Sequence, residues 1–87
     1  MLEKIAVVIV DDPRKVEAFY GWLRRNRRRV VGISDNRGCG CCVDMFDIVL
    51  DEQAEVMPCE TSGNFNSKSI LYGEERDKVL SELLDEH

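Results

Sequence analysis

A short apolar strand that leads directly into an amphipathic helix limits the folds open to this chain of 87 residues. Lys4–Val10 (KIAVVIV) is β-branched and apolar on both alternating faces, as is typical of a strand inside a sheet. Asp12 is a candidate N-cap, and Pro13 suits the first helical position because its missing N–H costs nothing there. One apolar stripe then follows at helical spacing, formed by Val16, Phe19, Tyr20 and Leu23. We therefore expect a helix that covers one face of a sheet.

Four further segments have strand patterns: residues 27–34, 42–50, 54–57 and 70–72. Asp44 and Asp47 interrupt the two alternating faces of the second of these segments in turn. Residues 51–53 predict a hairpin loop that pairs the second segment with the third, and Pro58 would end that third strand. The polar residues 60–69 predict a long surface loop.

A second helix is predicted from about Glu74, with acidic residues in its first turn and one apolar stripe, formed by Val79, Leu80, Leu83 and Leu84. The expected element order is β-α-β-β-(β)-(β)-α. Two helices with a single stripe each are most simply buried on one face of a mainly antiparallel sheet. We therefore expect residues 1–87 to form a single α+β domain, a two-layer sandwich that is loosely ferredoxin-like.

The composition sets several classes of protein aside. Hydrophobic residues make up 44% of the chain and charged residues 33%, which is typical of a folded globular domain rather than a disordered one. No window approaches the roughly 18 apolar residues that span a bilayer, and the run Ile5–Val10 is too short for a secretory signal. We expect a cytoplasmic protein with no membrane contact, whose four cysteines are reduced.

Three of these cysteines lie together in residues 39–42 (CGCC), and the fourth is Cys59. The candidate metal ligands are Cys39, Cys41, Cys42 and Cys59. Their spacing is a poor match to the paired knuckles of a zinc site, although thiolates alone can hold Cu(I). The expected strand register displaces Cys59 from Cys41 by about 13 Å along the strand. The favoured interpretation is a tight turn with small apolar side chains, and metal binding or thiol sensing is the alternative.

A run of arginines, RRNRRR, forms a second candidate site, made of Arg24, Arg25, Arg27, Arg28 and Arg29. Such a cluster can contact phosphate groups, in RNA or in another ligand. The chain is acidic overall, with a net charge of −5, and lacks an aromatic and basic strand motif, so nucleic acid is not expected as the main partner. The favoured interpretation is that these cations complement the negative end of a helix dipole and discourage another strand from pairing at the sheet edge.

Catalysis is not indicated. Acid–base or nucleophilic catalysis needs a base near a nucleophile, and the only histidine is His87, at the chain end, where fraying is expected. Residues 7–13 (VVIVDDP) resemble the first strand and acidic pair of response-regulator receiver domains. A receiver also needs a longer doubly wound chain, which 87 residues with two helices cannot supply. We expect no enzyme and no cofactor, apart from the zinc or Cu(I) considered for the cysteines.

Charge divides the chain into two unlike parts. Residues 1–43 carry nine Lys or Arg against five Asp or Glu, whereas residues 44–87 carry three against twelve. An acidic surface can steer a basic partner into place. The first functional hypothesis is therefore a protein–protein interaction or regulatory module, inhibitor-like, with a basic partner or as a homodimer joined at a sheet edge. The alternatives are a cysteine-based metal or thiol-sensing protein and an RNA or phosphate binder.

Overall fold

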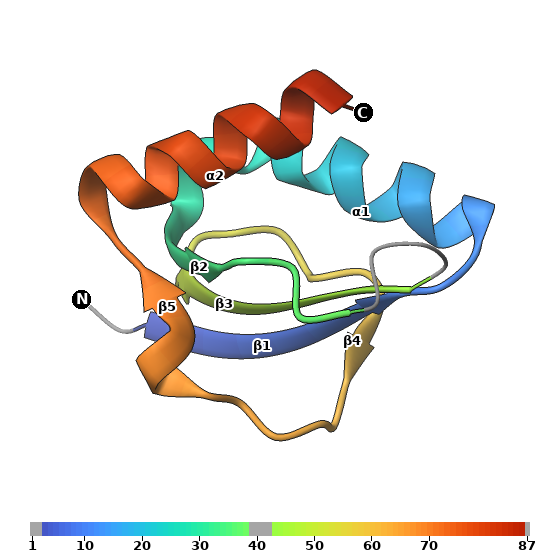
Figure 1. Cartoon of the computed structure of the whole chain (residues 1–87), viewed down its shortest axis with the longest axis horizontal. Coiled ribbons are helices and arrows are strands. Elements are labelled where there is room, and N and C mark those ends of the chain that lie inside the picture. The colour runs from blue at the N-terminus through green and yellow to red at the C-terminus, as the bar shows by residue number, and fades with distance from the viewer. Residues whose placement is uncertain (1–2, 39–42, 87) are drawn as a thin grey trace.

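The computed structural model describes residues 3–38 and 43–86 and places two helices on one face of a five-stranded sheet (Figure 1). The elements are β1 (Glu3–Val10), α1 (Pro13–Arg25), a 3₁₀ turn (Arg27–Arg29), β2 (Val30–Ser34), β3 (Asp44–Asp51), β4 (Glu60–Thr61), a second 3₁₀ turn (Ser67–Ser69), β5 (Ile70–Leu71) and α2 (Gly73–Glu86). The strands follow the order β4-β1-β3-β2-β5, and every neighbouring pair is antiparallel. The expected α+β two-layer fold is confirmed.

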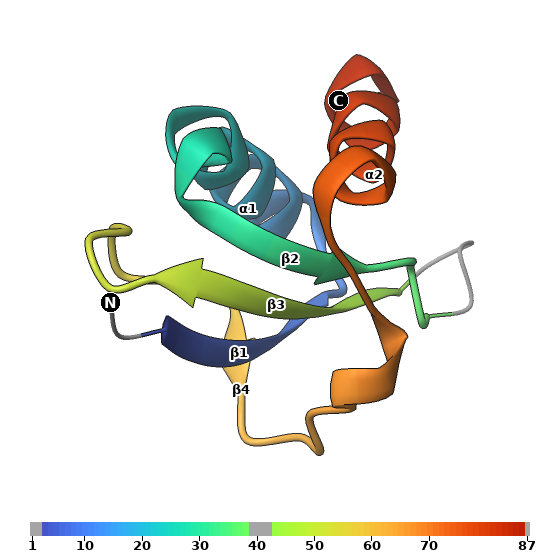
Figure 2. The same ribbon diagram turned by 90° about the vertical axis from the view of Figure 1, so that its left-hand side faces the viewer.

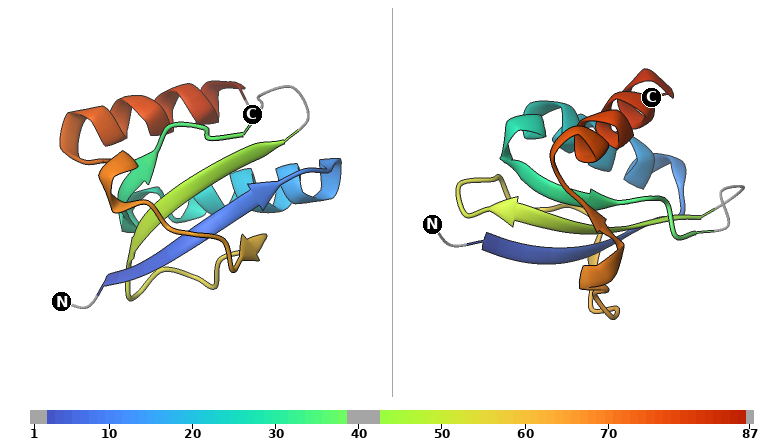
Figure 3. Two further views of the ribbon diagram at one scale, coloured as in Figure 1. Left: turned by 60° about the horizontal axis from the view of Figure 1, so that its bottom comes forward. Right: turned by 60° about the vertical axis from the view of Figure 1, so that its left-hand side comes forward.

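The connection between β4 and β5 distinguishes this fold from a ferredoxin-like chain. A ferredoxin-like chain runs β-α-β-β-α-β, whereas here no helix separates β3 from β4, and the second helix follows β5. Because β4 and β5 lie at opposite edges of the sheet, residues 62–69 must cross its whole width. Figures 2 and 3 show this segment, which we call the strap, passing over the face opposite the helices.

The main core lies between the sheet and the two helices. Asp12 caps α1 as expected, since its side chain accepts a hydrogen bond from the Lys15 backbone N–H at 3.0 Å. The largest buried side chains of the core come from both layers: Val8, Phe19, Tyr20, Trp22, Leu23, Ile33, Phe46, Ile48 and Leu80. Phe19 of α1 stacks on Phe46 of β3 with ring centroids 5.4 Å apart. The predicted helical stripes therefore face the sheet.

The expected strand over residues 27–34 begins later than predicted. Arg27–Arg29 form a 3₁₀ turn, in which the Arg29 N–H donates to the Asn26 carbonyl at 2.7 Å. The strand itself is confined to Val30–Ser34. The arginines thus lie on the bend between α1 and β2 rather than in the sheet.

The expected strand over residues 54–57 is absent, and the register built on it is wrong. Trp22 Nε1 donates to the Glu55 carbonyl at 3.1 Å, which holds this segment against α1. The fourth strand is Glu60–Thr61, beyond Pro58, and it pairs with β1. It cannot pair with β3 because β1 and β2 already occupy both edges of that strand. The expected displacement between Cys41 and Cys59 therefore has no basis.

Gly32 of β2 lies against side chains of the neighbouring strand β5 and of Tyr72. A Cβ atom at Gly32 would overlap the Ile70 Cγ2 methyl and lie 2.9 Å from Tyr72 Cε1. We expect Gly32→Ala to lower the free energy of unfolding by roughly 1–3 kcal/mol, because β5 must move. Gly21→Ala is the matched control, since its new methyl has space at 3.4 Å from Arg25 within α1 and should stabilise by about 0.5–1 kcal/mol. Urea unfolding measures both, and equal effects would contradict the close approach.

Candidate functional site

Cys59 is the one candidate metal ligand within the described residues, because Cys39, Cys41 and Cys42 lie outside them. It adopts a left-handed backbone conformation, with φ of 63°, just before β4. Burial raises the pKa of its half-buried thiol, although Lys15 opposes the change. Since metals and electrophiles react with the thiolate, a raised pKa disfavours such chemistry at this residue. Among residues 3–38 and 43–86, no three His, Cys, Asp or Glu side chains gather in a metal-binding arrangement.

The arginine run is brought together at one surface. All five candidates are exposed, and they line one shallow depression of about 510 Å³: Arg24, Arg25, Arg27, Arg28 and Arg29. A neighbouring depression of about 490 Å³ is lined by Arg27 and Arg28 together with Arg76 and Asp77 of α2. We call these two depressions the arginine groove. Its two halves come from the α1–β2 bend and from α2.

The acidic half of the sequence does not form one continuous acidic face. Asp51 of β3 lies 3.8 Å from the Arg29 guanidinium, and Glu55 lies 3.4 Å from that of Arg25. Both carboxylates are therefore paired with cations from the basic half. Five carboxylates of α2 are exposed: Glu74, Glu75, Asp77, Glu82 and Asp85. Folding thus places part of the negative charge next to positive charge and spreads six of the twelve carboxylates along α2.

Asp47 of β3 is fully buried on the sheet face opposite the helices. Arg37 Nη1 donates to its Oδ2 at 2.6 Å, and the Ser69 hydroxyl of the strap donates to the same oxygen at 3.1 Å. Its backbone N–H donates to the Ser34 hydroxyl at 2.9 Å. The other carboxylate oxygen, Oδ1, has no hydrogen-bond partner among the described residues. This cluster ties the strap to the central strand of the sheet, and the hydrogen bonds that it makes all join parts of the fold.

A second polar cluster joins Asn36, which follows β2, to Asp44 at the start of β3. Asn36 Nδ2 donates to Asp44 Oδ1 at 2.7 Å, and the Tyr20 hydroxyl donates to Asp44 Oδ2 at 3.2 Å.

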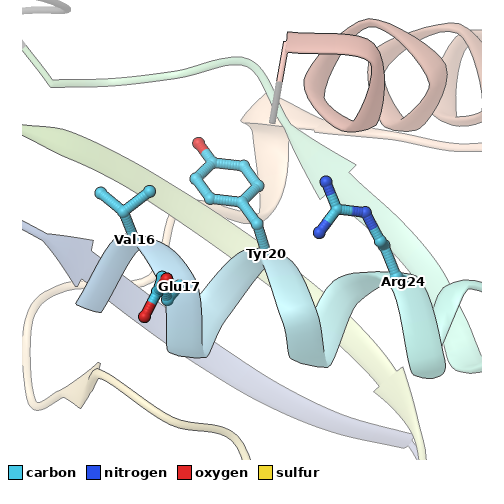
Figure 4. A pocket seen from close by; sticks show the side chains of 4 residues that line it. All are labelled: Val16, Glu17, Tyr20 and Arg24. Atoms are coloured by element: carbon cyan, nitrogen blue, oxygen red, sulfur yellow. The ribbon is translucent and has the colours of Figure 1, made fainter. Parts of the chain in front are cut away.

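A shallow pocket of about 420 Å³ lies along α1 and is lined by Val16, Glu17, Tyr20 and Arg24 (Figure 4). Val16, Tyr20 and Arg24 point to the same side of the helix, because residues four positions apart share one helical face. Its lining includes one acidic side chain, Glu17, and one basic side chain, Arg24. These four lining residues do not form a nucleophile and base pair of the kind that catalysis uses.

The outer edge of β1 is only partly paired. β4 covers Val7 and Val8, and the Ile9 N–H donates to the Cys59 carbonyl at 3.2 Å. Because backbone groups alternate between the two edges of a strand, Ile5 points its N–H and C=O to the same side as Ile9. Within the described part of the chain, no hydrogen bond reaches these two groups of Ile5.

An apolar pocket of about 180 Å³ lies beside this edge. Its lining comes from β1, the end of β3, the segment before β4 and the first residue of β4: Lys4, Ile5, Ala6, Leu50, Ala54, Glu55, Val56, Met57 and Glu60. Ile5 is 58% exposed and Val56 is 92% exposed, which is unusual for side chains of this kind around one small pocket. We call this combination the β1-edge pocket.

The opposite edge of the sheet is shielded. Arg76 of α2 extends its Nη1 to the carbonyl oxygens of Val30 and Val31, at 3.5 and 3.4 Å. β5 covers the remainder of β2 by pairing with Ile33 and Ser34. The open edge of β1 is therefore a local feature, and the sheet does not present two equivalent edges.

The fold and these surfaces define a two-layer α+β domain with a partly open sheet edge. Comparison with protein-family models, with curated proteins and with solved structures finds no match to the chain. No helix in the described ranges is long and apolar enough to cross a membrane.

Sequence reasoning did not find the β1-edge pocket. The sequence pattern of residues 54–57 predicts a strand that includes Val56, and nothing in its neighbours indicates that a loop leaves it in solvent. Asp47 did leave a signal, since a carboxylate in an otherwise apolar strand face requires a partner when buried. The partner, Arg37, lies ten residues away across a hairpin, so only the strand pairing reveals it.

Proposed function

We propose that the protein is a non-enzymatic binding module that takes an extended segment of a partner protein at the edge of β1. The observation that supports this proposal is the exposure of Ile5 and Val56 around one apolar pocket beside unpaired backbone groups. An extended peptide can add a strand to such an edge, where main-chain hydrogen bonds give affinity and side-chain pockets give specificity.

The partner segment is expected to be apolar at one position and basic nearby. An apolar side chain of the added strand would fill the β1-edge pocket and cover Val56. Glu55 is already paired with Arg25, whereas Glu60 lines the pocket without an ion pair among the described residues, so we expect a Lys or Arg of the partner to pair with Glu60. A second copy of the chain can offer the same edge, so self-association is the version of this proposal that needs no other protein.

A displayed library of short random peptides tests the proposal. We expect selected peptides to alternate apolar with basic residues, and a bound peptide to slow hydrogen exchange at the Ile5 amide. Val56→Asp should weaken a selected peptide by about tenfold or more, because it places a carboxylate where apolar contact is needed.

Asn64→Asp is the matched control, because it adds the same charge at an exposed strap residue that does not line the pocket. It should leave the affinity unchanged. Slowed exchange at Ile5 that depends on protein concentration without peptide would identify self-association. The proposal would be disproved by peptides that bind without slowing hydrogen exchange at the Ile5 amide, or that bind Val56→Asp and Asn64→Asp with equal affinity.

A further inference from the structure

The arginine groove carries more positive charge than the fold neutralises. Five of its arginines are exposed within six positions of the sequence, and α2 adds Arg76. The two depressions share Arg27 and Arg28, so they form one continuous surface between the α1–β2 bend and the start of α2. Six arginines line this surface, so it can contact more than one anionic group.

Two guanidinium groups of the groove have no bonding partner among the described residues. Among the described residues, neither Arg24 nor Arg28 has an ion pair or a side-chain hydrogen bond. Arg25 and Arg29 are paired only with Glu55 and Asp51, over 3.4 and 3.8 Å. The exposed Arg25–Glu55 pair is weak, and the Arg29–Asp51 pair is long, so both arginines can exchange their partners for a stronger acceptor.

The remaining cations are held in place. Arg27 Nη2 donates to the Ser81 hydroxyl of α2 at 2.8 Å. Arg76 bonds to the carbonyl oxygens of Val30 and Val31 and lies 3.0 Å from Asp77. Fixed guanidinium groups lose less conformational entropy on binding, which favours anion recognition at their outer N–H groups.

We propose that the arginine groove binds a ligand with two or more linked phosphate groups, with Arg24 and Arg28 as its principal contacts. Guanidinium groups match phosphate oxygens with two parallel hydrogen bonds, which a single lysine cannot do. The C-terminus of α1 opposes an anion with only about half a negative charge, which the surrounding arginines outweigh. Glu17 lines the pocket next to Arg24, and its negative charge repels an anion there, which limits the proposed binding site on that side.

This inference is independent of the proposed function, since the groove and the β1-edge pocket share no lining residue. Sodium tripolyphosphate is the probe, titrated into the whole chain at low salt and followed by calorimetry and by the arginine side-chain NMR signals. We expect saturable binding that weakens with salt, and clearly weaker binding of inorganic phosphate. Equal affinity for the two anions would refute the requirement for linked phosphates.

Arg24→Gln and Arg28→Gln should each reduce the affinity for tripolyphosphate by about tenfold or more. Arg14→Gln is the control, because Arg14 is an exposed arginine in the first turn of the same helix and does not line the groove. Since these side chains are exposed, all three variants should unfold at the same urea concentration as the parent chain. Equal losses in all three would mean that net charge alone attracts the anion, and would overturn the site.

A short single-stranded RNA identifies the source of the phosphates. RNA binding with the same dependence on Arg24 and Arg28 would assign the groove to a nucleic-acid backbone. Tripolyphosphate binding without RNA binding would assign it to a small phosphorylated ligand. Binding of neither probe would end the proposal, while leaving peptide binding at the β1 edge untouched.

Discussion

Replacing Arg37 with alanine is expected to lower the free energy of unfolding by about 3 kcal/mol. The cost arises because Asp47 stays fully buried when its counter-ion is removed. Its Oδ1 already lacks a partner among the described residues, and the Ser69 hydroxyl alone cannot compensate a buried charge. Urea unfolding of the parent chain and the variant measures the difference.

A double variant separates charge from packing. Asp47→Asn in the Arg37→Ala background removes the buried charge while keeping the side-chain shape, so it should recover more than half of the lost stability. Arg14→Ala serves as a control for the loss of an exposed arginine and should change stability by no more than about 0.5 kcal/mol. If the double variant is less stable than Arg37→Ala alone, the buried charge is not the cause.

Asn26→Ala is expected to destabilise the protein by roughly 2–3 kcal/mol, at about 1 kcal/mol for each of three hydrogen bonds. The buried Asn26 side chain donates to the Trp22 carbonyl and to the Glu55 carboxylate, both at 2.9 Å, and accepts from the Glu55 N–H at 3.1 Å. It thereby fastens the segment that lines the β1-edge pocket to the end of α1. Denaturant unfolding gives the global effect.

Hydrogen exchange at Glu55 supplies the local measurement for this variant. Its amide loses its acceptor in Asn26→Ala and should exchange much faster than the amides of β3, which keep their strand partners. Asn64→Ala is the comparison, because Asn64 is exposed in the strap and its replacement should be close to neutral. An unchanged exchange rate at Glu55 would refute the fastening role of Asn26.

The elements with strong local signals were predictable from the sequence. Asp12 and Pro13 start α1 where capping chemistry places its first turn, and the apolar stripe from Phe19 to Leu23 identifies the face that meets the sheet. The antiparallel two-layer arrangement follows from two such stripes. These predictions succeeded because helix capping and apolar periodicity depend on residues only a few positions apart.

Features that depend on distant residues were not predictable. Residues 54–57 have a strand pattern but form none, because Trp22 and Asn26 bond the backbone of Glu55 across about thirty positions of sequence. The arginine cluster was identified from its composition, yet its groove requires α2, and Arg76 has no sequence signal that links it to Arg28. Local patterns indicate which residues are candidates, and tertiary packing decides which of them meet.

The strap and the main core are expected to differ in their local stability. The strap is held at its ends by strands of two residues each, and most of its side chains are exposed, whereas β1, β2 and β3 share long ladders beneath the helices. Its release would break the Ser69–Asp47 hydrogen bond and uncover Asp47, and because most of its side chains are exposed we expect it to open at a lower free energy than the main core. Proteases and solvent would therefore meet the underside of the sheet well before the whole chain unravels.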